Sequence, residues 1–320
     1  MRCGDERVSG EASLIAIDWG TTRFRAWLVE AGGTIVDRLD KTAGILSVGD
    51  GDFGGTFDRL VGPWLQQHGG IPVVASGMIG SRQGWHEAPY AECPAGAVDL
   101  ADKLAAVTSP GGTAVRLVPG VTRIDADGVP DVMRGEETQI VGCLAAGDQP
   151  RRVFVLPGTH SKWAITEQGR ITRFATFMTG ELYALLRGHG ILGRLMDGDA
   201  HDPRTFRRGV EYGNKAGGGL LKRLFSVRTL PLFERLPATG VASYLSGLLI
   251  GQEIAEAIAW AGAPHIATTR PTIVGSSTLA PRYAEALAFL GIESSTGPEE
   301  AAVTGIHRIL AAAGALAERR

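Results

Sequence analysis

The sequence predicts an α/β fold built from two domains of similar design. The main indication is a repeat: a short apolar strand, a Gly-Thr turn and a second strand occur at 14–29 and again at 153–166. Helices with apolar residues at helical spacing are predicted at 53–67 and 243–261. A chain of 320 residues is also long for one hydrophobic core, so two domains of ordinary size are expected.

Composition excludes several classes of protein. With 44% hydrophobic and 21% charged residues, the chain is expected to be globular rather than disordered. Its net charge of -2 gives no electrostatic basis for binding nucleic acid or an anionic membrane. Cys3, Cys93 and Cys143 are far apart and form no C-x-x-C pair, which argues against zinc and for a reducing compartment. The first 13 residues are polar and no apolar run reaches about 20 residues, so a cytoplasmic location is expected.

The turn of the first repeat carries residues suited to phosphate binding. Asp18 ends the first strand and is placed to hold a divalent ion, while Gly20 allows close approach of the backbone to a ligand. Thr21 and Thr22 supply hydroxyl donors and Arg23 supplies positive charge. The structural alternative is a simple hairpin whose aspartate makes a side-chain turn, and the residues of this turn alone do not decide between the two.

The second repeat favours the functional interpretation. Gly158, Thr159, His160, Ser161 and Lys162 again follow an apolar strand and precede another. Two such hairpins can hold the phosphates of one nucleotide, with a metal ion between them. Because neither a Walker A sequence nor G-x-G-x-x-G occurs in the chain, the two hairpins are the candidate phosphate sites.

The duplicated pattern resembles the acetate and sugar kinase, heat-shock ATPase and actin superfamily. Within it, the stretches IDWGTTRFRAWL, ASGMIGSRQGW, VMRGEETQIVG, VLPGTHSKWAI and FMTGELYALL resemble the 2-dehydro-3-deoxygalactonokinase family, from about Leu14 to the end of the chain. The resemblance implies the actin-like ATPase fold, in which two ribonuclease-H-like domains have a nucleotide cleft between them. We place the domains at 12–150 and 151–320, with the boundary in the polar stretch 149–152.

A predicted strand at 71–75 ends in a loop that is a second candidate site, because ligands in α/β sheets gather at the carboxyl ends of strands. Gly77 opens this loop, and Trp85 and Tyr90 lie where they can flank a sugar. Their structural alternative is that both aromatic rings only pack the loop down. Arg82 either pairs with a substrate carboxylate or forms a surface ion pair with Glu87, and the family resemblance favours the substrate.

Residues 134–139 open a predicted helix with two carboxylates in its first turn. The structural interpretation of Glu136 and Glu137 is stabilisation of the helix N-terminus by negative charge. The resemblance implies that one of them is the general base, since related sugar kinases place an Asp-Thr pair here and Glu137-Thr138 matches it loosely. Arg134 is a further candidate for binding the substrate carboxylate.

Near the C-terminus, a strand at 272–274 is followed by Gly275, Ser276 and Ser277 and then by a helix. The superfamily places its adenosine-binding segment at such a turn, although Gly-Ser turns before helices are common. A last helix is predicted to start with a capping box from Thr296 to Glu299, and its role is structural.

The resemblance implies an ATP-dependent kinase that phosphorylates the 6-hydroxyl of 2-dehydro-3-deoxy-D-galactonate in galactonate catabolism. ATP and Mg²⁺ are the expected cofactors, with Asp18 at the metal. Phosphoryl transfer needs positioning, charge neutralisation and a base, which Glu137 or else Glu136 would provide. The expected partner is the small-molecule sugar acid, with a homodimer as one option for assembly and with no nucleic acid or membrane.

Three other functions remain open. A kinase of another sugar or sugar acid on the same fold is the first, and a requirement for Arg82 and the substrate carboxylate would distinguish it. A non-catalytic ATP-binding sensor is the second, although such chains carry partner-binding insertions for which 320 residues leave little room. A phosphatase of the polyphosphate type is the third, and it would lack an enclosed sugar pocket.

Overall fold

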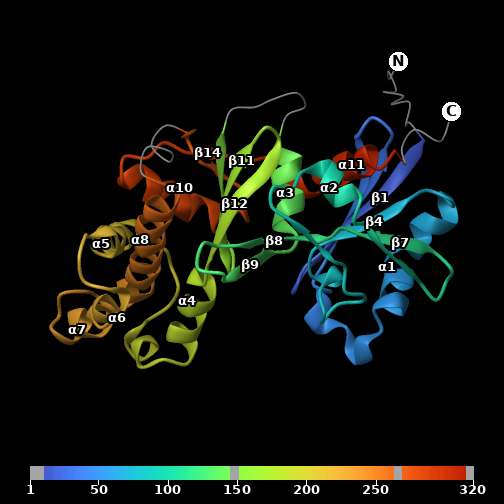
Figure 1. The fold of residues 1–320 in the computed structure, drawn as a ribbon. Helices are drawn as coiled ribbons and strands as arrows, with labels where there is room; N and C mark the ends of the chain where they lie inside the picture. Colours follow the sequence, from blue (N-terminus) through green and yellow to red (C-terminus); the bar gives the residue numbers. More distant parts are fainter. Residues whose placement is uncertain (1–10, 145–150, 263–268, 315–320) are drawn as a thin grey trace, which may run out of the picture. The chain divides into compact units, whose positions relative to one another are not determined.

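A computed structural model describes residues 11–144, 151–262 and 269–314 (Figure 1). The chain divides into two compact units. Unit 1 comprises Met1–Asp148, Gly169–Thr172 and Glu300–Arg320, and unit 2 comprises Gln149–Gln168 and Arg173–Glu299. The predicted boundary at 150/151 lies at the edge of the described residues. No helix within the described ranges is long and apolar enough to cross a membrane.

Unit 1 is built on a six-stranded sheet with the order β3-β2-β1-β4-β7-β6. Its strands are β3 (Ile35–Lys41), β2 (Phe24–Glu30), β1 (Ala12–Trp19), β4 (Val73–Ser76), β7 (Ala114–Leu117) and β6 (Ala105–Thr108). The first three strands pair antiparallel, and β1, β4 and β7 run parallel. Leu14 to Ile17 of β1 are fully buried, because this central strand is covered on both faces.

A small second sheet and several helices complete unit 1. The sheet pairs β5 (Tyr90–Glu92), β8 (Gly120–Ile124) and β9 (Pro130–Met133). The helices are α1 (Phe53–Gln67), α2 (Ala97–Ala101), α3 (Glu136–Cys143) and α11 (Ala301–Ala312), with short 3-10 turns at Ile45–Ser47, Gly49–Gly51 and Met78–Gly80. The bounds predicted for α1 are confirmed. The apolar stretch 115–122 predicts one strand by its sequence, and this is wrong, since it is divided between β7 and β8, which belong to different sheets.

Helix α11 packs against α3 within unit 1, at very short range. A Cβ atom on Gly305 would lie 1.9 Å from the carbonyl oxygen of Thr138, and one on Gly142 would lie 1.8 Å from that of Ala301. Only glycine at these two positions lets the helix backbones come so close. The C-terminal stretch therefore belongs to unit 1, which differs from the predicted domain 151–320. The predicted capping box is also wrong, because Thr296 pairs with Ile273 as part of β14 and the helix starts later.

Unit 2 repeats the strand order of unit 1. Its sheet runs β12-β11-β10-β13-β14. The strands are β12 (Arg170–Phe177), β11 (Ser161–Glu167), β10 (Arg152–Leu156), β13 (Thr272–Ile273) and β14 (Ser295–Thr296). Here too β10 pairs antiparallel with β11 and parallel with β13. Three antiparallel strands followed by parallel ones is the order of a ribonuclease-H-like domain, and its occurrence in both units confirms the predicted fold class.

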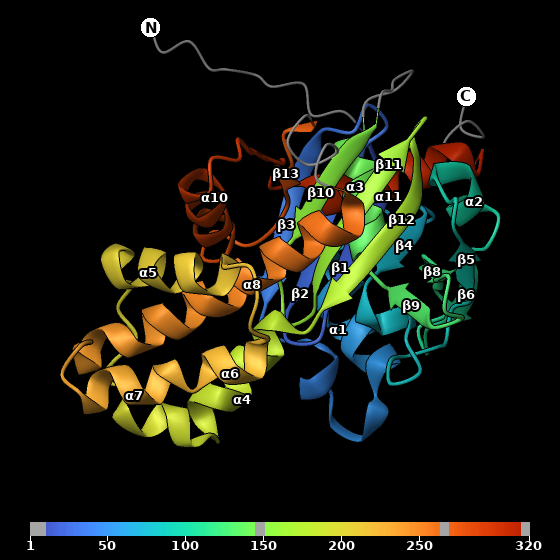
Figure 2. The ribbon, with the colours of Figure 1, turned by 60° about the vertical axis from the view of Figure 1, so that its left-hand side comes forward.

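Helices cover the sheet of unit 2, and Figure 2 shows α8 crossing its strands. The helices are α4 (Thr179–Gly188), α5 (Pro203–Asn214), α6 (Leu220–Leu224), α7 (Ser226–Leu232), α8 (Val241–Ala261) and α10 (Ala280–Phe289). The expected close approach of α8 to another backbone is confirmed. A Cβ atom on Gly247 would lie 2.0 Å from the carbonyl oxygen of Phe206, and one on Gly209 would lie 2.2 Å from that of Tyr244. Glycines on both helices thus form the contact of α5 with α8.

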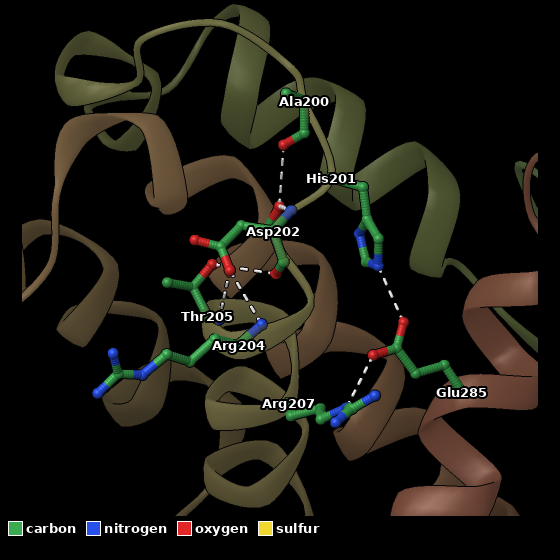
Figure 3. Close-up of polar contacts among 8 residues, drawn as sticks. Ala200, His201, Asp202, Arg204, Thr205, Arg207 and Glu285 are labelled. Carbon is green, nitrogen blue, oxygen red and sulfur yellow. Dashed lines mark hydrogen bonds and ion pairs between the residues drawn. The ribbon is translucent and has the colours of Figure 1, made fainter.

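The start of α5 is fixed by local polar contacts (Figure 3). The carboxylate of Asp202 accepts hydrogen bonds from the backbone N–H groups of Arg204 and Thr205 at 2.9 and 3.2 Å, which caps the helix. On α10, Glu285 accepts from His201 Nε2 at 2.9 Å and from Arg207 Nε at 2.8 Å. The two bonds tie α10 to the first turns of α5.

Candidate active site

The turn between β1 and β2 points three backbone N–H groups to one side. The carbonyl oxygens of residues 20–22 accept hydrogen bonds of 3.0 to 3.2 Å from the backbone N–H groups of residues 44–46. In a trans peptide the C=O and the next N–H point in opposite directions, so the N–H groups of residues 21–23 point away from 44–46. Consecutive N–H groups arranged in this way suit an anion such as a phosphate. The side chains of Thr21 and Thr22 are exposed beside them, and Arg23 pairs with Asp40 at 2.7 Å.

Asp18 lies where the carboxyl ends of two parallel strands meet. It stands beside Ser76 in the register of β1 and β4, and its carboxylate forms an ion pair with Arg25. Gly77 follows with a φ of 91°, and a Cβ atom there would lie 2.9 Å from the carbonyl oxygen of Trp19 and 3.1 Å from Oδ1 of Asp18. Glycine is therefore required at 77 both for its backbone conformation and for space.

The start of α3 reaches the same point. Gly135 has a φ of 107°, and a Cβ atom on it would lie 3.2 Å from the Cα of Gly77. In unit 1, Gly77 thus lies next to both Asp18 and Gly135. Glu137 is two residues further, at the first turn of the helix. The turns predicted to carry the metal ligand and the general base are therefore close together.

Glu137 is fully buried and held by two donors. Its Oε2 accepts from the backbone N–H of Gly135 at 2.7 Å, and its Oε1 accepts from Thr138 Oγ1 at 2.8 Å. Burial, with a smaller contribution from the charge of Glu136, raises the pKa of Glu137 to about 7, against a lowering by these two hydrogen bonds. Glu136 is less buried, and its Oε2 accepts from the backbone N–H of Arg134 at 3.0 Å.

Arg134 is a buried cation with spare donors. Its side chain lies over the ring of Tyr90 at 4.4 Å from the centroid, and Nη2 donates to the carbonyl oxygen of Ala88 at 2.9 Å. Its Nε and Nη1 have no partner among the described residues, and neither do the buried hydroxyls of Ser76 and Ser81. A Cβ atom on Gly80, next to Ser81, would lie 3.3 Å from Nη1. Unpaired buried donors are costly unless a ligand or water satisfies them.

Arg82 and Trp85 lie in different surroundings. The Arg82 side chain is 82% exposed and forms an ion pair with Glu87 through two contacts of 3.3 Å. Trp85 packs against the core of unit 1, with its ring 5.6 Å from that of Phe57. Both arrangements agree with the structural alternatives given above for these residues.

In the second hairpin, the predicted phosphate-binding residues divide between the surface and the core. Thr159 and His160 are exposed, and His160 Nε2 contacts Glu181 Oε2 at 2.5 Å. Ser161 and Lys162 are buried, Ser161 bonding to the hydroxyl of Tyr283 at 2.8 Å and Lys162 Nζ donating to Thr176 at 2.7 Å. The side chains of Ser161 and Lys162 thus bond within unit 2.

A cavity of about 220 Å³ lies beside this hairpin, entirely within unit 2. Its walls are formed by Gly158, Thr159, Thr179, Gly180, Tyr183, Ser246, Leu249, Ile250, Leu279, Arg282 and Tyr283. The predicted adenosine segment is close by, since Gly275 approaches Pro157 and Ser276 Oγ accepts from the backbone N–H of Leu279 at 3.3 Å. The cavity combines apolar walls, suited to a flat base, with a turn predicted to bind phosphate.

The described residues fit a magnesium ion only if the phosphates of a bound nucleotide supply further ligands. No group of three or more His, Cys, Asp or Glu side chains suited to a metal occurs in the described part of the chain. Mg²⁺ is commonly held by one or two carboxylates, water and substrate phosphates, and Asp18 beside the N–H groups of 21–23 provides such a half-site. The Asp18 side chain is 12% exposed and would exchange its contact with Arg25 for the ion.

Comparison with known proteins decides the family. The family model described as 2-keto-3-deoxy-galactonokinase matches residues 18–309, which include both hairpins, α3 and the cavity. The chain belongs to this family. The resemblance found in the sequence motifs is thereby confirmed.

Relatives of known name support the same assignment. The chain is similar to the 2-dehydro-3-deoxygalactonokinase of Escherichia coli K12, with 34% identity over 282 residues, or 88% of this chain and 91% of the relative. A relative from Rhizobium meliloti 1021 with the same assigned activity is 34% identical over 281 residues, or 87% and 89% of the two chains. A crystal structure of a Sinorhizobium meliloti protein, also assigned as a 2-dehydro-3-deoxygalactonokinase, is 32% identical, has a TM-score of 0.82 and covers 95% of this chain and 99% of its own.

Sequence reasoning did not single out the cavity residues Tyr183, Arg282 and Tyr283. They lie on helices whose pattern is that of ordinary amphipathic segments, and no local motif marks them. It also placed Glu253 on the polar face of α8, which is wrong, since that side chain is only 2% exposed.

Proposed function

We propose that this chain transfers the γ-phosphoryl group of ATP to the 6-hydroxyl of 2-dehydro-3-deoxy-D-galactonate, in galactonate catabolism. Family membership supports the reaction. The single structural observation that carries it is the adjacency of Asp18, Gly77 and Gly135, with Glu137 at the helix start. This adjacency supports the proposal, because the turn predicted to bind phosphate lies near a carboxylate whose pKa is raised by burial to about 7.

Glu137 is the proposed general base. As the 6-oxygen bonds to the γ-phosphorus, the bond from that phosphorus to the β–γ bridging oxygen breaks, ADP leaves, and the hydroxyl proton passes to the Glu137 carboxylate. A base with a pKa of about 7 is ionised in half the molecules at neutral pH and still accepts a proton effectively. Glu136, which is partly exposed, is the second candidate.

Asp18 is the proposed protein ligand of Mg²⁺, which when bound would neutralise phosphate charge. The N–H groups of residues 21–23 would bind phosphate oxygens directly, and the hydroxyls of Thr21 and Thr22 would add donors. These groups are positioned before the substrate arrives, so they need no reorganisation during the reaction.

The cavity of unit 2 is the proposed site of the adenosine. Leu249, Ile250 and Leu279 provide apolar contacts for a base, and Arg282 and Tyr183 border it. Gly158 and Thr159 lie at the same cavity and would meet the phosphates. Gly275, Ser276 and Ser277 remain proposed contacts of the adenosine.

Arg134 is the proposed anchor of the substrate carboxylate. It offers two unpaired donors in a buried position, whereas Arg82 is exposed and already paired. A charge-assisted bond to a desolvated carboxylate would select a sugar acid over a neutral sugar. Gly77, Arg82, Trp85 and Tyr90 remain proposed to border the sugar site.

The test is release of ADP from ATP and Mg²⁺, measured with 2-dehydro-3-deoxygalactonate, its gluconate epimer, neutral galactose or no sugar. Turnover only with the galactonate compound is expected. Turnover with another sugar acid would keep the kinase and replace the substrate. ADP release that ignores every sugar would contradict the kinase and leave an ATPase or sensor.

A further inference from the structure

A carboxylate is buried beneath the second hairpin, in the middle of α8. Glu253 accepts hydrogen bonds from Trp163 Nε1 at 2.8 Å and from the hydroxyl of Tyr283 at 2.6 Å. The same Tyr283 hydroxyl is 2.8 Å from Ser161 Oγ. Glu253 thus connects α8 to α10 and to both the first and third residues of β11.

Glu253 is also hydrogen-bonded to Thr179, the first residue of α4. The start of α4 is packed on the turn of the hairpin: the backbone N–H of Glu181 donates to the carbonyl oxygen of Thr159 at 2.9 Å. A Cβ atom on Gly180 would lie 2.3 Å from the carbonyl oxygen of Gly158. One carboxylate therefore links the elements on both sides of the turn that borders the cavity.

The donors of this cluster have a fixed direction. The indole N–H of Trp163 can only donate, and it occupies one oxygen of Glu253. Tyr283 donates its single hydrogen to the other oxygen, so Ser161 must donate its hydrogen to Tyr283. The Ser161 hydroxyl consequently has no hydrogen left for a phosphate, and it serves as an anchor for the hairpin.

A buried carboxylate in a core position needs a reason, because an apolar residue there would avoid the cost of desolvation. Burial raises the pKa of Glu253, and the hydrogen bonds that its carboxylate accepts oppose that rise. All of the groups that satisfy it belong to, or adjoin, the cavity wall and the hairpin. Neither the chemistry at Glu137 nor the sheet itself requires it.

We propose that Glu253 is a positioning residue for the nucleotide, which through Tyr283, Ser161 and Thr179 holds the second hairpin in the shape that meets the phosphates. This rests on the proposed function, since it takes the unit 2 cavity to be the nucleotide site. Glu253 does not line the cavity itself, and Tyr283 does. Glu253 would therefore affect nucleotide affinity indirectly, through residues that line the cavity, and would not affect binding of the sugar acid.

The test uses Glu253→Gln in the full chain. Glutamine has the same shape, but one of its terminal atoms donates rather than accepts. With its oxygen on Trp163, its amide N–H would donate to the Tyr283 hydroxyl and would reverse the direction of the hydrogen bonds from Glu253 through Tyr283 to Ser161. We expect the Kd for ADP with Mg²⁺, measured by calorimetric titration, to rise about tenfold. The KM for ATP is expected to rise in parallel while the KM for the sugar acid stays the same, a division that general loss of structure would not produce.

Glu285→Gln is the matched control. Glu285 also accepts from two side chains and also ties α10 to a neighbouring element, but its partners His201 and Arg207 belong neither to the hairpin nor to the cavity wall. The control is expected to bind ADP as the unmodified chain does. Tyr283→Phe is the second variant, since it removes only the hydroxyl. If both residues act through the same series of hydrogen bonds, the change in binding free energy for ADP in the double variant should be smaller than the sum of the changes in Tyr283→Phe and Glu253→Gln.

The outcomes are distinguishable. If Glu253→Gln folds and binds ADP with unchanged Kd, the inference is overturned. If it does not fold, Tyr283→Phe decides: a raised Kd supports the inference and an unchanged one overturns it. If the unmodified chain fails to bind ADP at all, the nucleotide site fails with the proposed function, and the positioning role falls with it.

Discussion

The two hairpins share a sequence pattern and a place in their sheets, yet their side chains are used differently. In the first, Asp18 at the end of β1 pairs with Arg25 on β2, and Arg23 in the turn is exposed and pairs with Asp40. In the second, Ser161 and Lys162 are turned into the core and only Thr159 and His160 are exposed. The backbone turn is repeated, but the chemistry is not.

The difference follows from what surrounds each turn. The first turn is held by backbone bonds from residues 44–46, and the side chains of Thr21 and Thr22 remain exposed. The second turn has α4 packed on it and is anchored by side chains to α8 and α10 through Glu253. The two hairpins therefore hold their turns in different ways. The first exposes polar side chains that we propose to act in the reaction, and the second is supported by a buried polar cluster.

The largest effect is expected at Glu137, which belongs only to the first region. Glu137→Gln should lower kcat about a thousandfold, because general bases contribute between about 10²- and 10⁴-fold. Glu136→Gln should lower it less than about tenfold. Steady-state kinetics with both substrates saturating would measure this. The reverse order of the two variants would move the base to Glu136.

Replacing one residue in each hairpin tests the comparison directly. Asp18→Asn should reduce kcat about a hundredfold, since it weakens the proposed metal ligand. Ser161→Ala should leave kcat within about twofold and raise the Kd for ADP a few-fold, since it removes one anchoring hydrogen bond. Both quantities come from the assays already described. Equal losses of kcat would contradict a division of roles between the hairpins.

Glu137 should affect the pH dependence of activity and that of stability in opposite directions. The rate constant kcat/KM should fall about tenfold per pH unit below about 7, where the base becomes protonated. Stability should change the other way. The folded state keeps a proton on Glu137 that the unfolded chain loses above its ordinary pKa of 4.5. The contribution of Glu137 to the free energy of unfolding should therefore be largest below pH 4.5 and should fall by about 3 kcal/mol as the pH rises to about 7.

Denaturant titrations across that pH range would measure the stability effect, with Glu137→Gln as the control. Because glutamine does not titrate, the fall in the free energy of unfolding between pH 4.5 and about 7 should be smaller in this variant than in the unmodified chain. An identical slope in both proteins would show that other carboxylates determine the pH dependence and that Glu137 has an ordinary pKa.

Arg134 and Arg82 form a second contrast, within unit 1. Arg134→Lys should raise the KM for the sugar acid about tenfold, because a buried charge-assisted hydrogen bond is worth about 1.5 to 3 kcal/mol. Arg82→Lys should change it less than about twofold, as expected of an exposed ion pair. The KM for ATP should stay the same in both. A larger effect at Arg82 would return the carboxylate anchor to the exposed loop.

The smallest effect is expected at the cap of α5. Asp202→Ala removes two hydrogen bonds to the helix start and should cost about 1 kcal/mol of unfolding free energy. The Kd for ADP should not change, because the cap lies outside the hairpin and its buried cluster. Thermal unfolding and calorimetric titration would check both, and weaker ADP binding would mean that the nucleotide site depends on the whole of α5.

The elements that sequence analysis placed well are those defined by local pattern. The two hairpins, α1 and the close-packed glycines of α8 follow from strand-like runs, helical spacing and small residues. The two hairpin turns that we propose to bind phosphate could be located for the same reason, since Gly20 and Gly158 follow apolar strands.

What could not be predicted depends on distant partners. Glu253 looks like a solvent-facing residue until Trp163, Tyr283 and Thr179 are brought to it by three other elements. The pairing of Thr296 with Ile273 likewise converts an apparent helix cap into a strand. Family resemblance supplied Glu137, because a carboxylate in the first turn of a helix is by itself an ordinary stabilising feature.

The packing of α11 on α3 has a consequence for how the protein is made. The last helix of unit 1 is synthesised only after the whole of unit 2, and until then Thr138 and Gly142 lack the backbone that packs against them. The packing of α3, whose first turn holds Glu136 and Glu137, is therefore completed only by α11. A chain that stopped before α11 would have both hairpin turns but would leave α3 without this packing, and we expect it to lose the proposed function of Glu137.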